Sequence, residues 1–223
     1  MLSFAHLRMR YDPYPIGVAR EVIDADRYAA LVAAFPPVEL FQKMPGGGKY
    51  SLSEVNQPAA YRAFLDRTPA WMHVYREIKT KRFIADVFAM LREHHVAVPT
   101  GQTFTSRFEF AAMPLNGGYL KPHTDLASKV VTIVVSMCAK DPDAETAVGA
   151  GTAVLRPRDP FQVLEDYHAP REAFEVMETL FYQKNQAVVF VKTFNSWHSV
   201  GPMTGDAPAM RQTITINIER EHT

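Results

Sequence analysis

Two residues near the middle of the chain, His123 and Asp125, have side chains that bind metal ions and are separated by a single residue. On an extended chain the side chains of residues two apart leave the same face, so both can reach one ion. His198 is the best candidate for a third ligand, because it follows the β-branched, apolar run 186–191 and precedes a Gly-Pro turn. Two histidines and one carboxylate would leave coordination positions open on one side of the ion. The sequence therefore predicts a metal centre built from these three residues.

A strand with one polar face is predicted near the end of the chain. From Thr213 to Glu219 polar and apolar residues alternate strictly, which is typical of a strand with different environments on its two faces. Arg211, Thr213 and Thr215 share one of these faces. Arg211 follows His198 by thirteen residues (211 − 198).

The order of these residues resembles that of a known family. His123-x-Asp125, a long gap, Trp197-His198-Ser199 at a strand end and then Arg211-x-Thr213 resemble the motifs of the 2-oxoglutarate and Fe(II)-dependent oxygenases, in their prolyl-4-hydroxylase-like branch. The resemblance covers roughly residues 104 to 219. It implies a double-stranded β-helix (jelly roll), Fe(II) at the three ligands, 2-oxoglutarate as co-substrate and dioxygen, and it leaves open a requirement for ascorbate. Because Asp125 keeps the carboxylate, hydroxylation, or a related desaturation or ring closure, is favoured over halogenation, in which a small residue replaces the carboxylate.

The resemblance also implies how the co-substrate is held. Arg211 matches the basic residue that grips its far carboxylate, and Thr213 can add a hydroxyl hydrogen bond. Where relatives often carry tyrosines, this chain has Met113 and, by alignment, Ser136, so Ser136 is a further candidate. If the anchor is not Arg211, Lys129 and Arg107 are the next residues to consider.

Two alternatives remain open. A cupin-like metal or sugar-binding module without turnover would keep the barrel and the histidines but would not need Arg211 and Thr213 to face the metal. Zinc would bind the same three residues as iron.

The rest of the pattern predicts a mainly β protein with N-terminal helices (α+β), whose jelly-roll core is flanked by the helices. We expect one domain, 1–223, in which 1–100 is a helical support region and 101–223 is the catalytic core. Short edge strands are expected before residue 22, a helix from Asp24 or Asp26 to Ala34, and helices from 57 to about 95, one of them capped by Thr80. Strands are expected at 103–112, 119–122, 130–137, 152–155, roughly 176–182, 187–192 and 211–219.

Two segments are candidates for lids over a site. The loop 41–50 contains three successive glycines, Gly46 to Gly48, and the polar stretch 156–170 has the character of an insertion between strands. Loops that close over active sites need such hinges.

Composition excludes several classes of partner. The chain has 223 residues with 24 basic and 24 acidic side chains, so no global field attracts nucleic acid or an anionic membrane. No stretch has the length and hydropathy of a membrane span. Cys138 is the single cysteine, which excludes an internal disulfide and favours the cytoplasm. A small-molecule or amino-acid-like substrate is expected, and the oligomeric state is left open.

Overall fold

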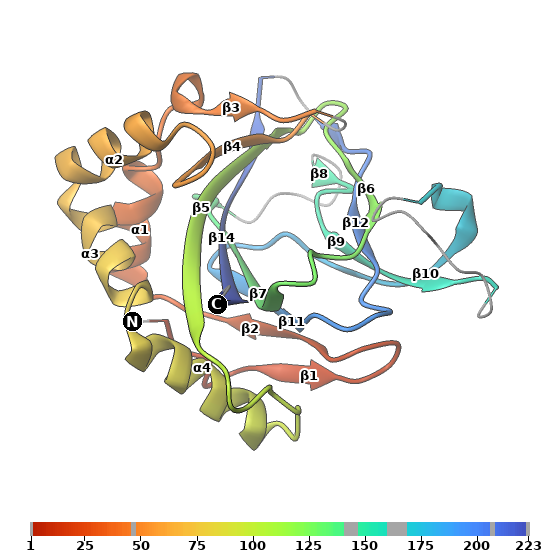
Figure 1. Ribbon diagram of the computed structural model, residues 1–223. Helices are drawn as coiled ribbons and strands as arrows, with labels where there is room; N and C mark the ends of the chain where they lie inside the picture. Colours follow the sequence, from red (N-terminus) through yellow and green to blue (C-terminus); the bar gives the residue numbers. More distant parts are fainter. Residues whose placement is uncertain (1, 46–47, 141–146, 160–168, 206–207, 222–223) are drawn as a thin grey trace.

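Two antiparallel sheets face each other in the computed structural model, which describes the chain except for residues 1, 46–47, 141–146, 160–168, 206–207 and 222–223 (Figure 1). The large sheet has eight strands, in the order β1 (Arg8–Arg10), β2 (Ile16–Arg20), β11 (Gln186–Val191), β7 (Lys129–Ser136), β14 (Met210–Arg220), β5 (Phe104–Pro114), β4 (Tyr50–Ser53) and β3 (Gln42–Lys43). The small sheet has four, in the order β10 (Phe174–Leu180), β9 (Thr152–Pro157), β12 (His198–Val200) and β6 (Leu120–His123). A separate pair joins β13 (Thr204–Gly205) to β8 (Ala147–Val148).

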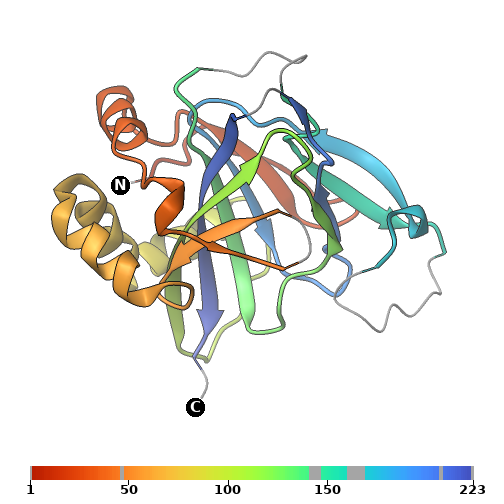
Figure 2. The same cartoon turned by 90° about the horizontal axis from the view of Figure 1, so that it is seen from above.

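Four helices cover the outer face of the large sheet, and Figure 2 shows them gathered on one side of the molecule. They are α1 (Ala25–Ala33), α2 (Pro58–Arg67), α3 (Pro69–Ile78) and α4 (Lys81–Glu93). The Asp24 carboxylate accepts from backbone N–H groups at the start of α1, and the Thr80 hydroxyl accepts from Phe83 N at the start of α4. Both caps follow from the preference of short polar side chains for the position before a helix.

An aromatic cluster fixes the helices to the sheet. The ring centroid of Trp71 on α3 lies 4.8 Å from that of Phe110 and 5.9 Å from that of Phe108, both on β5. Its indole nitrogen donates to the Ala34 carbonyl, at 2.9 Å. Because these side chains are almost fully buried, the outer face of the large sheet has a dense apolar backing.

A second apolar layer fills part of the space between the sheets. Ile16, Val188 and Phe190 of the large sheet meet Val154 and Leu180 of the small one. Apolar side chains therefore fill the middle of the space between the two sheets. Polar side chains occupy the interior towards β6 and β14.

The fold class is the one that the sequence predicts, with differences in detail. The N-terminal hundred residues contribute strands β1 to β4 to the large sheet as well as the helices. The segment 41–50 was expected to be loop, but residues 42–43 form β3, and Tyr50 begins β4, which pairs with β5. The tenth strand spans 174–180 rather than 176–182. The three successive glycines favour a loop when the sequence is considered locally. The hairpin is stabilised by pairing with β5, which lies more than fifty residues further along the chain, so a local pattern does not predict it.

Part of each predicted lid lies outside the described residues. Gly46 and Gly47 belong to the residues that the structure does not describe, and so do 160–168 of the predicted insertion. Across the described parts of the chain, no helix combines the length and apolar character needed to cross a bilayer.

Candidate active site

Strand pairing in the small sheet brings the two histidines together. His198 at the start of β12 lies directly opposite His123 at the end of β6, and their ring centroids are 4.3 Å apart. Asp125 follows β6 by two residues and so lies in a loop, not on the extended strand that the sequence suggests. One possible ligand atom from each of the three side chains lies within 4.8 Å of the others.

Backbone carbonyl groups determine which imidazole nitrogen is free. Nδ1 of His123 lies 2.8 Å from the Lys121 carbonyl oxygen, and Nδ1 of His198 lies 3.0 Å from that of Ser196. A carbonyl oxygen only accepts hydrogen bonds, so Nδ1 carries the proton in both rings. Each Nε2 therefore keeps a lone pair for a metal ion, and each ring is held in a fixed orientation.

The three side chains have the protonation states that a metal centre needs. Burial, followed by the nearby His198, lowers the pKa of His123 to about 3. Burial also lowers the pKa of His198. For Asp125 burial alone would raise the pKa, but the Lys129 ammonium, His198 and the Thr132 hydroxyl together lower it. At neutral pH the site contains two neutral imidazoles and one carboxylate.

Both oxygens of the Asp125 carboxylate have partners. Lys129 Nζ lies 2.8 Å from Oδ1, and Thr132 Oγ1 donates to Oδ2 at 2.6 Å. The same hydroxyl lies 3.1 Å from Oδ1 of Asn217 on β14. Sequence reasoning did not identify Thr132 or Asn217, although Thr132 interrupts the apolar run 130–135 and Asn217 lies on the polar face of an alternating strand. Their inward-facing hydroxyl and amide were the available signal.

Arg211 lies buried at the start of β14, 5 % exposed. Its Nε donates to the Ala150 carbonyl at 2.7 Å, and its guanidinium carbon lies 5.2 Å from the centroid of the Tyr182 ring. Within the described parts of the chain no carboxylate forms an ion pair with this guanidinium. Burial lowers the pKa of Arg211, yet a guanidinium stays charged at neutral pH. A buried cation without an anion is costly, so the position suits an anionic ligand.

Thr213 and Ser136 lie close to Arg211 in the same sheet. Thr213 is two residues further along β14 on the same face, and it pairs directly with Ser136 of β7. Both residues are buried. Met113 lies opposite Arg211 on β5.

The two reserve candidates for the anion anchor are already paired. Arg107 Nε lies 2.7 Å from a Glu219 carboxylate oxygen, and Lys129 is bonded to Asp125. A tyrosine does lie against Arg211, but it is Tyr182, which the sequence did not single out. Its hydroxyl is bonded to the backbone of Gln212.

The donor set fits a divalent transition-metal ion. Two imidazole nitrogens and one carboxylate oxygen on adjacent positions form the two-histidine, one-carboxylate arrangement that leaves three coordination positions free. The carboxylate reduces the charge of such an ion to one residual positive charge.

The facing sheets, with these ligands at one end of the small sheet, define the double-stranded β-helix class of fold. A prolyl-4-hydroxylase of Pseudomonas putida superposes with a TM-score of 0.52 over 92 % of each chain, at 16 % identity. A 2-oxoglutarate-Fe(II) oxygenase family protein of Burkholderia pseudomallei gives a TM-score of 0.53 at 14 % identity, over 92 % of this chain and 84 % of that one. The 2-oxoglutarate-dependent epimerase SnoN from nogalamycin biosynthesis gives 0.51 at 12 % identity, over 92 % and 76 %. No family model and no curated protein matches the sequence. The shared fold is the one that the resemblance in the sequence implies.

Proposed function

We propose that this protein is a non-haem Fe(II) and 2-oxoglutarate-dependent dioxygenase that hydroxylates its substrate. The observation that carries the proposal is the convergence of His123, Asp125 and His198, whose ligand atoms lie within 4.8 Å of one another. Both rings present Nε2, since their Nδ1 atoms are bonded to backbone carbonyls. When bound, iron with 2-oxoglutarate and dioxygen would supply oxidative decarboxylation to succinate and insertion of oxygen into a C–H bond.

In this proposal the residues of the chain bind and orient the reactants. Arg211 binds the far carboxylate of 2-oxoglutarate with its guanidinium, which has no carboxylate partner among the described residues. Thr213 and Ser136 supply hydroxyl groups beside it. Phe190, whose ring centroid lies 4.6 Å from that of His198, excludes water from one side of the metal centre.

The substrate belongs to the proposal as well. We infer a small-molecule or amino-acid-like substrate, supported by a balanced net charge that gives no reason to expect nucleic acid. The fold neighbours include both a prolyl hydroxylase with a bound peptide fragment and the epimerase SnoN, so the fold accepts either kind. A cytoplasmic location rests on the single cysteine.

The test is a succinate assay with Fe(II), 2-oxoglutarate and ascorbate against a panel of amino acids, proline-containing peptides and small aromatic compounds. We expect succinate to form in proportion to a product that is one oxygen atom heavier than its substrate. The matched variant Arg211→Ala should need far more 2-oxoglutarate. A protein that binds Fe(II) but never consumes 2-oxoglutarate would instead be the cupin-like binding module.

A further inference from the structure

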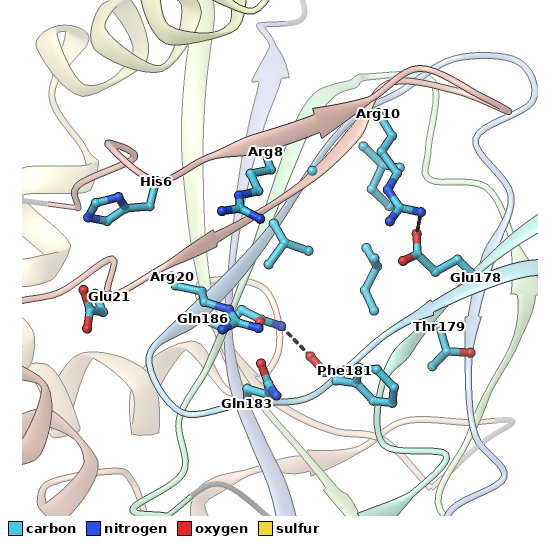
Figure 3. Close-up of a pocket in the computed structure, with 14 residues that line it drawn as sticks. His6, Arg8, Arg10, Arg20, Glu21, Glu178, Thr179, Phe181, Gln183 and Gln186 are labelled. Atoms are coloured by element: carbon cyan, nitrogen blue, oxygen red, sulfur yellow. Dashed lines mark hydrogen bonds and ion pairs between the residues drawn. The ribbon is translucent and has the colours of Figure 1, made fainter. Parts of the chain in front are cut away.

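A pocket of about 540 Å³ lies at the edge of the sandwich opposite β6, where the β1–β2 hairpin faces β10 (Figure 3). Its floor contains Ile16, Val18 and Leu180, which belong to the apolar layer between the sheets or pack against it. Phe190, which contacts His198, is part of the same layer. The layer therefore separates this pocket from the metal centre.

Three arginines reach this pocket from neighbouring strands. Arg8 pairs with Val18 in the β1–β2 ladder, so Arg8 and Arg20 lie on one face and are diagonal neighbours. Arg10 forms an ion pair with Glu178 of β10, which closes one end of the pocket. Arg8 and Arg20 have no ion pair with any residue that the structure describes. Figure 3 shows both guanidinium groups directed into the pocket, while Glu21 points away from them.

Arg8 and Arg20 are exposed, so solvent partly screens the repulsion between their guanidinium groups, and an anion bound between them would remove it. Like charges on neighbouring strands are destabilising, and each guanidinium can bind two oxygens of a phosphate or carboxylate group. Two unpaired positive charges match a group that carries two negative charges, as a phosphate monoester does at neutral pH.

The remainder of the pocket is suited to an apolar group. Phe181 lies at the rim with 68 % of its surface exposed, so its ring is free to pack against an apolar ligand group. The buried amide of Gln186 donates to the Phe181 carbonyl and so fixes this rim, and Gln183 lies beside it. The volume is in the range of small-molecule sites, which is roughly 300 to 1,000 Å³.

We infer that this pocket is a binding site for an organic phosphate monoester, separate from the metal centre. The phosphate lies between Arg8 and Arg20, and the apolar body lies on Ile16, Leu180 and Phe181. The inference does not depend on the activity proposed above, since none of these residues belongs to the metal site.

The test is a titration of metal-free protein with phenyl phosphate, followed by the NMR signals of backbone amides in β1, β2 and the 181–183 turn. Sodium chloride at the same ionic strength is the reference. We expect saturable binding that the double variant Arg8→Gln, Arg20→Gln weakens by at least about tenfold, since the charged partners of the phosphate are lost. Arg62→Gln, Arg82→Gln removes the same charge from exposed helix positions and should leave binding unchanged.

Two further probes test the class of ligand. Inorganic phosphate lacks the apolar body and benzoate carries one negative charge, so both should bind more weakly than phenyl phosphate. The melting temperature of the Arg8→Gln, Arg20→Gln variant without ligand should be equal to or above that of the wild type, because a repulsion is removed. The inference would be overturned if this variant bound phenyl phosphate as well as the wild type, or if no saturable binding appeared at millimolar concentrations. A lower melting temperature of the variant would also overturn it, because it would assign the arginines a structural role.

Discussion

Thr132 donates a hydrogen bond of 2.6 Å to the Oδ2 atom of Asp125. The hydroxyl has one proton to donate, and Oδ1 of Asn217, at 3.1 Å, is a second possible acceptor. The charged carboxylate is the stronger and nearer acceptor, so it receives the hydrogen bond. The orientation of the carboxylate is therefore determined by a strand of the large sheet, although Asp125 itself follows a strand of the small sheet.

This hydrogen bond predicts that Thr132→Val weakens metal binding without unfolding the protein. Loss of a group that orients a metal ligand typically reduces affinity by about 10- to 100-fold. Titration with Co(II) under anaerobic conditions measures the effect, and Thr152→Val, at a buried threonine of β9, is the matched control. An affinity equal to that of the control would show that Asp125 is oriented without Thr132.

Replacing any of the three proposed ligands should abolish turnover and leave the fold largely intact. Packing, rather than the ion, holds the sheets together through the apolar layer around Phe190 and Val154. For His198→Ala we expect a circular dichroism spectrum like that of the wild type and no stoichiometric Fe(II) binding. His73→Ala, on an exposed face of α3, should bind Fe(II) normally. Retention of half the affinity by His198→Ala would remove His198 from the proposed ligand set.

Substitutions at Arg211 should affect 2-oxoglutarate binding more than the maximal rate. The far carboxylate is remote from the reacting atoms and is gripped similarly in ground and transition states, so KM rises more than kcat falls. Arg211→Ala should cost about 2 to 5 kcal/mol of binding, and Arg211→Lys less because it keeps the charge. Thr213→Val removes a neutral donor and should cost only about 0.5 to 1.5 kcal/mol. A 2-oxoglutarate titration in which Thr213→Val is the worse variant would place the anchor elsewhere.

The stability of the metal-free protein should fall as the pH drops below about 6.5, the ordinary pKa of histidine. The pKa of His123 is lowered from 6.5 to about 3 in the folded protein, so the unfolded chain binds more protons between these values. The free energy of unfolding then decreases with falling pH, by at most about 1.4 kcal/mol per pH unit for each such histidine. Asp125 acts in another window, since its lowered pKa gives stability that is lost only as the pH falls below 3.8.

Urea unfolding in the presence of a chelator, at several pH values between about 6.5 and 4, measures this slope. His123→Gln should make the dependence shallower, because the substituted side chain does not titrate. Thr152→Val, which changes a buried side chain that does not titrate, should keep the wild-type slope. An identical slope in His123→Gln and the wild type would show that another group causes the pH dependence.

The sequence alone predicted the fold class and the residues proposed for the metal site, because those signals are local. His123 and Asp125 are two residues apart, and Arg211 opens a strand whose alternation is plain. The capping residue Thr80 was also predictable from its side chain. Local chemistry of this kind needs no knowledge of what lies across the sheet.

Contacts between distant parts of the chain could not be predicted in the same way. Thr132 and Asn217, for example, are separated by 85 residues. Tyr182 contacts Arg211 because both side chains pack near Ala150 in the folded chain. Arg8 and Arg20 lay in a segment that we expected to be a lead-in with short edge strands. Strand register between non-neighbouring segments determines these contacts, and a single sequence does not reveal it.

The three proposed ligands are held by contacts to different sheets, and this has a consequence for stability. Both histidines are held by the ladder of β6 and β12, whereas the carboxylate of Asp125 is tied to β7 through Thr132 and lies near Asn217 of β14. An ion bound by all three residues would therefore act as a non-covalent cross-link between the small sheet and the helix-covered large sheet. At a free concentration a hundred times its dissociation constant, such an ion adds about 2.7 kcal/mol to the free energy of unfolding. Metal binding would therefore also strengthen the association between the two sheets.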